Sequence, residues 1–404
     1  MEIAFSDKIS ISFKKDILLT PMIYVVWAYM AITYLRGVFL RLPVIKDNVE
    51  IAIILYFAIP VILAIPSLFN KFCLGDHLFY LANVLFLLSG YVFFPENTEY
   101  LNENILTCIF CIFPFYFLGR IIEIEKSFDA FLLLSAACIL LDLFYFLVYA
   151  QNNKNMEEVA GQDNMFAAYQ ILPHVAFLLW ATLKKFRIWK IVTTFLGILF
   201  LLSCGTRGPL VCLGFFTIIY FFFYMNFKGA VYVKFFILAM ASIVIVNLQS
   251  IAIALAKVFT GLQLSTRILE KFITGELGND SYRSVLRDRL YEVLDSGNHF
   301  FGLGAFGCRN YDIVYPHVLH LDFFCTYGYL VGTALLILLF LLIGWAFWLS
   351  RNTSEQVFLL FLFSITIIKL LLSGTFIQEP YFFLLIGACV KVFLDKRSIL
   401  YDNR

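Results

Sequence analysis

Arg207 is the first residue whose type and position could do chemistry. It lies in the short stretch Ser203 to Pro209, between two long apolar runs. A guanidinium group pairs two oxygens of a phosphate at once, so Arg207 is a candidate phosphate ligand. The structural alternative is an arginine that turns toward headgroups from the end of a membrane helix, which is common.

A second set of arginines lies in a long hydrophilic segment. An apolar stripe at helical spacing predicts an amphipathic helix there, lying on the membrane face. The stripe consists of Tyr282, Val285, Leu286, Leu290, Val293 and Leu294. At 100° per residue, Arg283 and Arg287 fall at its edge and Arg289 falls within it. These arginines are candidates for neutralising a pyrophosphate group, and a solvated helix balanced by Asp288 and Glu292 is the alternative.

Two histidines and an aspartate follow where the hydrophilic segment returns to an apolar run. His317 and His320 share one face if a helix has already begun, and Asp322 follows closely. A neutral imidazole suits general-base work near pH 7, and a structural histidine is the alternative. No Cys or carboxylate pattern completes a zinc set, so we expect no metal.

Lys369 is an ionisable residue inside an apolar run. An ionisable group in a membrane span is costly and is by default a candidate for function. Asp142 has a similar position and is a weaker candidate.

The segment Phe301 to Gly307 satisfies the spacing G-x-G-x-x-G of dinucleotide sites. That fingerprint requires a preceding strand and a following helix, which this part of the sequence does not supply. We interpret its glycines as a tight turn where backbone approaches backbone or ligand.

Membrane helices must position all of these residues. Of the 404 residues, 62% are hydrophobic and 14% charged, against about 25% charged in soluble domains. Continuous apolar runs near 20 residues match a bilayer core of about 30 Å and favour helices over a β-barrel. We therefore expect an all-α polytopic integral membrane protein in which residues 1–404 form a single membrane domain with about twelve spans. The runs lie near 17–40, 49–68, 78–95, 104–120, 127–149, 164–183, 188–204, 208–227, 231–257, 323–349, 356–373 and 379–395.

The orientation of these spans follows from the bias of Lys and Arg toward cytoplasmic loops. The strongest basic link is formed by Lys184, Lys185, Arg187 and Lys190. Placing it in the cytoplasm puts both termini inside and the short turn 205–209 outside. The segment 258–317 then forms one large extracytoplasmic loop, and long loops of this kind usually carry function. Cys73 and Cys308 fall on opposite sides, so we expect no disulfide between them.

Two function classes are disfavoured by the composition and motifs. A net charge of +2 argues against a general nucleic-acid binder. The phosphate-loop pattern G-x-x-x-x-G-K-[ST] does not occur in the sequence, which argues against ATP chemistry at the cytoplasmic face.

The order of the motifs resembles that of the O-antigen ligase and O-antigen (polysaccharide) polymerase superfamily. The resemblance covers about residues 160–395 and includes an Asn-x-Phe-Ala start of a span at 164–167. Its other motifs are Thr-Arg-Gly at 206–208, Tyr-Arg at 282–283, Phe-Gly-x-Gly at 301–304, Pro-His at 316–317 and Tyr-Gly-x-x-x-Gly at 327–332. The sequence departs from the family at Val318, where Asn is common, and at Asp322, where Glu or Gln is usual. The choice between His317 and His320 as the working residue is therefore open, and we favour His317.

The resemblance implies a metal-independent, cofactor-free glycosyltransferase of the membrane-embedded GT-C-like type in the bacterial inner membrane. Undecaprenyl-pyrophosphate-linked oligosaccharide would be donor and acceptor for a polymerase of O-antigen or capsular repeats, with a chain-length regulator and a flippase as partners. Arg207, Arg283 and His317 match the family's catalytic residues. The expected substrate-binding residues are Arg287, Arg289, His320, Asp322 and Lys369.

Two alternatives to a polymerase stay open. One is an O-antigen ligase that transfers glycan to lipid A core. The other is a transporter of polysaccharide or small molecules, which is disfavoured because the hydrophilic residues concentrate outside the membrane rather than at its midplane.

Overall fold

The structure, a computed structural model, describes most of the chain from residue 72 onward. The described residues are 2–6, 9–12, 72–152, 160–225, parts of 231–246, 247–261, 266–275, 283–298, 300–350 and 353–402. The predicted runs 17–40 and 49–68 lie outside them, as does much of 231–247. The strands β1 (Glu2–Ser6) and β2 (Ile9–Ser12) pair as an antiparallel hairpin, which the all-α expectation did not include.

Helices make up most of the described residues, and five helical stretches are long and apolar enough to cross a membrane. These are Leu74–Phe93, Pro95–Ile121, Ile124–Phe144, Arg207–Tyr224 and Leu319–Leu349. Shorter apolar helices are Ile188–Ser203, Leu248–Gly261 and Thr353–Ile368. The predicted helical architecture is therefore confirmed, and its apolar helices are those of a membrane protein by length and composition. The number of twelve spans stays a prediction.

The chain divides into two compact units. Unit 1 comprises residues 1–131, 286–362 and 373–404, and unit 2 comprises 132–285 and 363–372. The helices wholly or mostly in unit 1 are α5 (Leu74–Phe93), α6 (Thr98–Thr107), α7 (Phe115–Ile121), α15 (Arg283–Val293), α16 (Leu319–Leu349), α17 (Thr353–Phe363) and α18 (Pro380–Asp402). Short 3-10 or π turns there are η1 (Pro95–Asn97), η2 (Cys108–Ile112), η5 (Leu294–Asn298), η6 (Gly307–Tyr311) and η8 (Phe376–Gln378).

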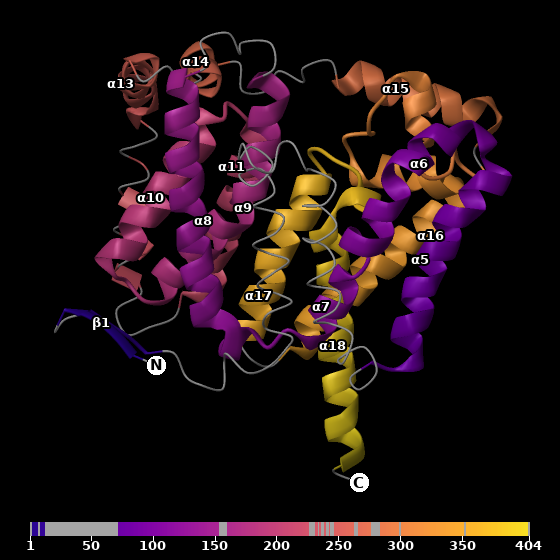
Figure 1. The fold of residues 1–404 in the computed structure, drawn as a ribbon, viewed down its shortest axis with the longest axis horizontal. Coiled ribbons are helices and arrows are strands. Elements are labelled where there is room, and N and C mark those ends of the chain that lie inside the picture. The colour runs from indigo at the N-terminus through magenta and orange to yellow at the C-terminus, as the bar shows by residue number, and fades with distance from the viewer. Residues whose placement is uncertain are drawn as a thin grey trace. The chain divides into compact units, whose positions relative to one another are not determined.

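Helix α7 packs closely against α18 in unit 1 (Figure 1). A Cβ added at Gly119 would overlap the carbonyl oxygen of Leu384, and one at Gly387 would overlap that of Tyr116. Small residues let membrane helices approach at backbone distance, where dispersion contacts replace the hydrophobic effect that lipid does not supply.

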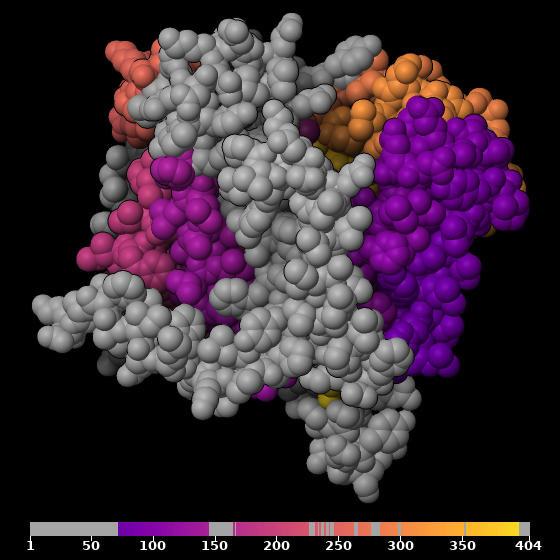
Figure 2. Space-filling view, viewed as in Figure 1, coloured from indigo at the N-terminus to yellow at the C-terminus, as the bar shows by residue number. Residues whose placement is uncertain are grey.

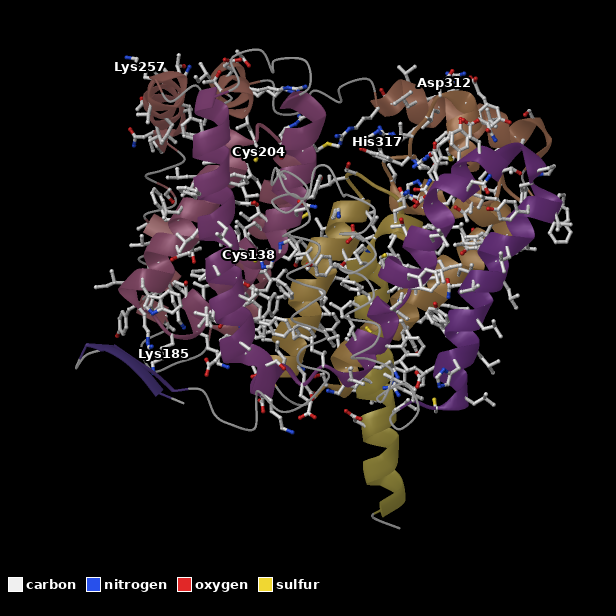
Figure 3. All side chains as sticks on the ribbon, viewed as in Figure 1. Cys138, Lys185, Cys204, Lys257, Asp312 and His317 are labelled. Carbon is white, nitrogen blue, oxygen red and sulfur yellow. The ribbon has the colours of Figure 1, made fainter. Side chains whose placement is uncertain are left out.

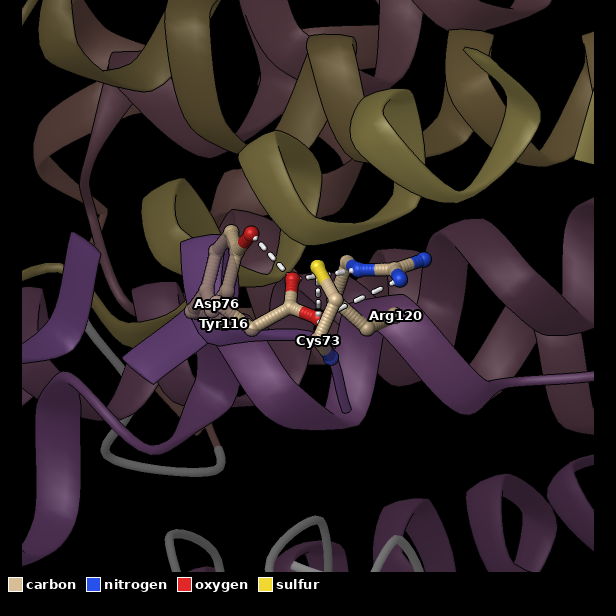
Figure 4. Close-up of polar contacts among 4 residues, drawn as sticks. All are labelled: Cys73, Asp76, Tyr116 and Arg120. Carbon is tan, nitrogen blue, oxygen red and sulfur yellow. Dashed lines mark hydrogen bonds and ion pairs between the residues drawn. The ribbon is translucent and has the colours of Figure 1, made fainter. Parts of the chain in front are cut away.

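A buried ion pair joins the start of α5 to α7 in the same unit (Figure 4). Arg120 Nε lies 2.7 Å from Asp76 Oδ1, and the two side chains are only 8% and 1% exposed. The carboxylate also accepts hydrogen bonds from the Tyr116 hydroxyl at 2.7 Å and the Cys73 backbone N–H at 2.9 Å. A buried charge is tolerated only when paired and hydrogen-bonded, and these contacts supply that.

Unit 2 is a bundle in which α8, α9 and α10 lie alongside one another (Figure 1). Its helices are most of α8 (Ile124–Asn152), α9 (Ala160–Lys184), α10 (Ile188–Ser203), α11 (Arg207–Ile219), α13 (Leu248–Gly261) and α14 (Arg267–Thr274), with the π turns η3 (Tyr220–Tyr224) and η7 (Ser364–Ile368). Gly197 of α10 packs against Val175 and Ile139, which brings the three helices together.

The long hydrophilic segment contains helices and a core of its own. In its unit 1 part, Leu290 of α15 and Leu294 of η5 are fully buried in a cluster with Leu303 and with Leu321 of α16. At these positions the apolar stripe packs on protein rather than on lipid.

The predicted centre of the stripe on α15 is wrong. Val285 and Arg289 are exposed, whereas Arg283 and Arg287 are half-buried on the side of Leu290. Val285 and Tyr282 had placed Arg289 within the predicted stripe. Val285 is exposed, and Tyr282 lies outside the described residues. Arg289 is therefore a solvated cation and not one on the buried face.

Candidate functional site

Arg207 is the first residue of α11 in unit 2. The chain reverses after α10 through Gly205, whose φ of 68° lies in the left-handed region that glycine adopts without strain. Thr206 takes the N-cap position with extended backbone, and Pro209 fits the first turn, where backbone N–H groups have no helical acceptor. The first-turn N–H groups, which have no helical acceptor, and the helix dipole favour an anion at this end, and the Arg207 guanidinium adds a full charge.

The turn that carries Arg207 lies at the opposite end of α10 from the basic link. Lys185 precedes α10 and Cys204 follows it, as the labelled side chains show (Figure 3). This matches the sequence-based expectation that turn and link face opposite sides of the membrane, although the sides themselves stay a prediction.

Tyr169 of α9 connects the Arg207 turn to Lys369. A Cβ added at Gly208 would overlap the Tyr169 hydroxyl oxygen, so the helix start and this phenol are in direct contact. On the ring of the same tyrosine, Lys369 Nζ lies 5.1 Å from the centroid. An ammonium group at this distance is attracted by the negative face of the ring.

Arg283 reaches the same turn of chain as Lys369. Its Nη1 donates a hydrogen bond to the Leu372 carbonyl at 2.9 Å, and the Leu372 N–H donates to the Lys369 carbonyl at 2.9 Å. Contacts through Tyr169 and Leu372 therefore connect three basic residues from distant parts of the sequence. We call Arg207, Arg283 and Lys369 the basic cluster.

Lys369 directly follows the π turn η7. A π turn in a membrane helix shifts the register of the residues that follow, and such turns are frequent at functional sites. Within η7, Thr366 is fully buried, and its hydroxyl has no hydrogen-bond partner among the described residues.

His317 in unit 1 precedes α16 rather than lying on it. Its φ of 63° is left-handed, and α16 begins only at Leu319. His317 and His320 therefore do not share a helical face, because the turn at His317 interrupts the spacing on which that expectation depended. The His317 ring packs on Tyr315 with centroids 4.4 Å apart.

His320 is engaged with the loop helix α15. Its Nε2 lies 3.0 Å from the Tyr291 hydroxyl. Burial, assisted by Cys325 and Asp288, raises the pKa of Tyr291 above its ordinary value. The phenol is therefore neutral at physiological pH and can donate this hydrogen bond to the imidazole.

Asp322 is hydrogen-bonded to the start of the turn η8. Its carboxylate accepts hydrogen bonds from the Thr375 hydroxyl at 3.1 Å and the Phe376 N–H at 2.8 Å, and the residue is only 4% exposed. Both carboxylate oxygens are used inside the protein. This arrangement favours a positioning role for Asp322 over direct contact with substrate.

The predicted site residues fall in both units. Unit 2 contains the basic cluster, and unit 1 contains Arg287, Arg289, His317, His320 and Asp322. Sequence reasoning missed Tyr169, because it is one of 22 tyrosines and carries no motif. Among the described residues, no group of three His, Cys, Asp or Glu side chains is arranged to hold a metal ion.

Comparisons with protein-family models, curated proteins and solved structures found no match to this chain. The assignment of a function therefore depends on the chemistry of the described residues and on the motif resemblance.

Proposed function

We propose that the chain is a membrane glycosyltransferase that polymerises undecaprenyl-pyrophosphate-linked oligosaccharide repeats at the outer face of the bacterial inner membrane. The connection of the basic cluster residues through Tyr169 and Leu372 supports this proposal. Three basic residues connected in this way, one of them at a helix N-terminus, suit a group with two phosphates.

In the proposed reaction, the acceptor hydroxyl oxygen attacks the anomeric carbon of the donor sugar. The new glycosidic bond forms as the bond from that carbon to the pyrophosphate oxygen breaks, and the hydroxyl proton passes to a general base, the role that the motif resemblance gives to His317. Negative charge grows on the departing undecaprenyl pyrophosphate, where Arg207, Arg283 and Lys369 stabilise it. Preorganised charge of this kind is often the largest contribution to catalysis.

The roles of the other predicted residues follow from their contacts. Arg287 lies on the half-buried side of α15 and stays a candidate for binding substrate. Arg289 is exposed and His320 is hydrogen-bonded to Tyr291, so we expect smaller contributions from these two.

Surface glycan in a strain that lacks the chromosomal gene provides the test. Plasmid-borne Arg207→Ala, Arg283→Ala and His317→Ala variants should insert normally into the membrane. These strains should make lipid A core that carries a single repeat. Arg187→Ala, an exposed arginine at the other end of α10, is the matched control and should restore long-chain glycan.

Gel electrophoresis of the surface glycan also distinguishes the alternatives. Lipid A core without any repeat in the null strain would indicate a ligase, and unchanged glycan would indicate transport of another compound. Long-chain glycan from both Arg207→Ala and His317→Ala would refute the catalytic assignment.

A further inference from the structure

Residues 302–311 of the long segment pack against the turn between α5 and α6 within unit 1 and are hydrogen-bonded to it. Asn97 of this turn is fully buried, and its Nδ2 donates hydrogen bonds to the carbonyls of Leu303 at 2.7 Å and Ala305 at 3.1 Å. Its Oδ1 accepts a hydrogen bond from Asn310 Nδ2 at 2.6 Å. In the space-filling view, orange atoms of the loop region adjoin the purple atoms of α5 and α6 (Figure 2).

Glycines bring the loop into contact with this turn. Gly304 has a φ of 74°, and a Cβ there would lie 2.5 Å from the Phe94 ring. A Cβ at Gly307 would lie 3.2 Å from the Asn97 amide nitrogen. The loop and the turn between α5 and α6 are therefore fixed against each other without a ligand.

A pocket of about 270 Å³ lies at this junction. It is lined by Glu96, Gly302, Leu303, Gly307, Asn310 and Tyr311. Sites for drug-sized ligands usually measure about 300–1,000 Å³, so this pocket has room for one ring rather than a chain of several.

The lining groups match a sugar ring. The Glu96 carboxylate accepts hydrogen bonds from hydroxyl groups, and the Asn310 amide and Tyr311 phenol can both donate and accept them. The Tyr311 ring, which packs against the buried cluster around Leu303, offers an apolar surface to the C–H face of a pyranose.

The charges around the pocket disfavour a phosphate there. The lining residues include the Glu96 carboxylate and no cation. The nearby Arg309 is directed elsewhere, since its Nη1 lies 3.5 Å from Glu103 and its guanidinium lies 5.6 Å from the Tyr100 ring centroid. An uncharged, hydroxyl-rich ligand fits this electrostatic environment.

We propose that this pocket is a saccharide-binding subsite that holds one sugar residue of an oligosaccharide. The proposal rests on the proposed function and deepens it, because a polymerase of oligosaccharide repeats must bind the sugars of its substrate. Asn97 is a positioning residue for the subsite and does not line it.

Saturation-transfer NMR on the purified full chain tests the subsite. The probes are the methyl glycosides of glucose, galactose and N-acetylglucosamine, and the repeat oligosaccharide released from the host's lipid carrier by mild acid. At least one probe should bind, and Glu96→Gln should weaken its binding about ten-fold, the effect of losing one charge-assisted hydrogen bond. Glu96 is exposed, so the variant should fold normally.

Two control variants separate this proposal from the proposed function. Glu99→Gln removes an exposed carboxylate of α6 outside the pocket and should leave the dissociation constant unchanged. Arg207→Ala should also bind the probe normally even if it makes no polymer. Equal affinity of Glu96→Gln and the unchanged chain, or binding of no probe at all, would overturn the subsite whatever the glycan of Arg207→Ala looks like.

Discussion

At the scale of single residues, two glycines of α11 have opposite surroundings and make a matched pair. Gly208→Ala would force a Cβ into the Tyr169 hydroxyl, while Gly214 has nothing within 4 Å of its Cβ position. We expect Gly208→Ala to displace Tyr169 and with it the neighbouring Lys369, which should lower both the melting temperature and polymer length. A thermal shift assay in detergent and a gel of surface glycan measure the two effects.

Gly214→Ala is the control for this prediction. Alanine is favoured over glycine inside a helix by about 0.5–1 kcal/mol, so this variant should keep its glycan and melt at the same temperature or slightly higher. Equal behaviour of the two variants would show that contact between Gly208 and Tyr169 has no role in the site.

Single residues could be selected as candidates from the sequence where their type conflicts with their surroundings. Arg207 and Lys369 are cations in apolar sequence, and that conflict alone marked them as candidates. Tyr169 and Asn97 show no such conflict. They were missed because the contacts that distinguish them are with residues 200 or more positions away in the sequence. His317 was identified from its motif, but its left-handed backbone could not be inferred from residue types.

At the scale of elements, the junction of α5 and α7 depends on a buried carboxylate. Asp76→Asn would leave the Arg120 guanidinium, which is 8% exposed, without its counter-charge. Removing one partner of a buried pair typically costs about 3–5 kcal/mol, so we expect a clear fall in melting temperature. The thermal shift assay in detergent measures it.

The matched control for this element is an exposed ion pair at the start of α8, between Lys126 of the helix and Glu123 just before it. Lys126 and Glu123 are paired, but their side chains are 70% and 50% exposed. Solvent screens such pairs, so Glu123→Gln should leave the melting temperature unchanged. If Asp76→Asn melts like Glu123→Gln, the buried pair does not hold α5 to α7.

Helix positions were the most predictable feature of the elements. The run expected near 188–204 is the helix Ile188–Ser203, and the run near 323–349 is Leu319–Leu349. Continuous apolar sequence determines such helices locally. The N-terminal hairpin was not predicted, and neither was the buried side of α15, because long-range packing selects which of several apolar positions is covered.

At the scale of the whole molecule, the central expectation is that the long segment faces the outside and the basic link faces the cytoplasm. Val314 of the segment is 64% exposed and Lys185 of the link is exposed, so cysteines at these positions will be accessible. The labelling background needs Cys73→Ser, because Cys73 is the exposed member of the native cysteines, whereas Cys308 is buried and a poor reporter.

The positive-inside bias predicts different labelling of the two introduced cysteines. In intact spheroplasts, a membrane-impermeant maleimide should label Val314→Cys and should label Lys185→Cys only after the membrane is opened. The reverse pattern would place the Arg207 turn, at the opposite end of α10 from Lys185, in the cytoplasm. Donor sugars that are displayed on the outer face would then be out of its reach, and the proposed polymerase would be excluded together with the topology.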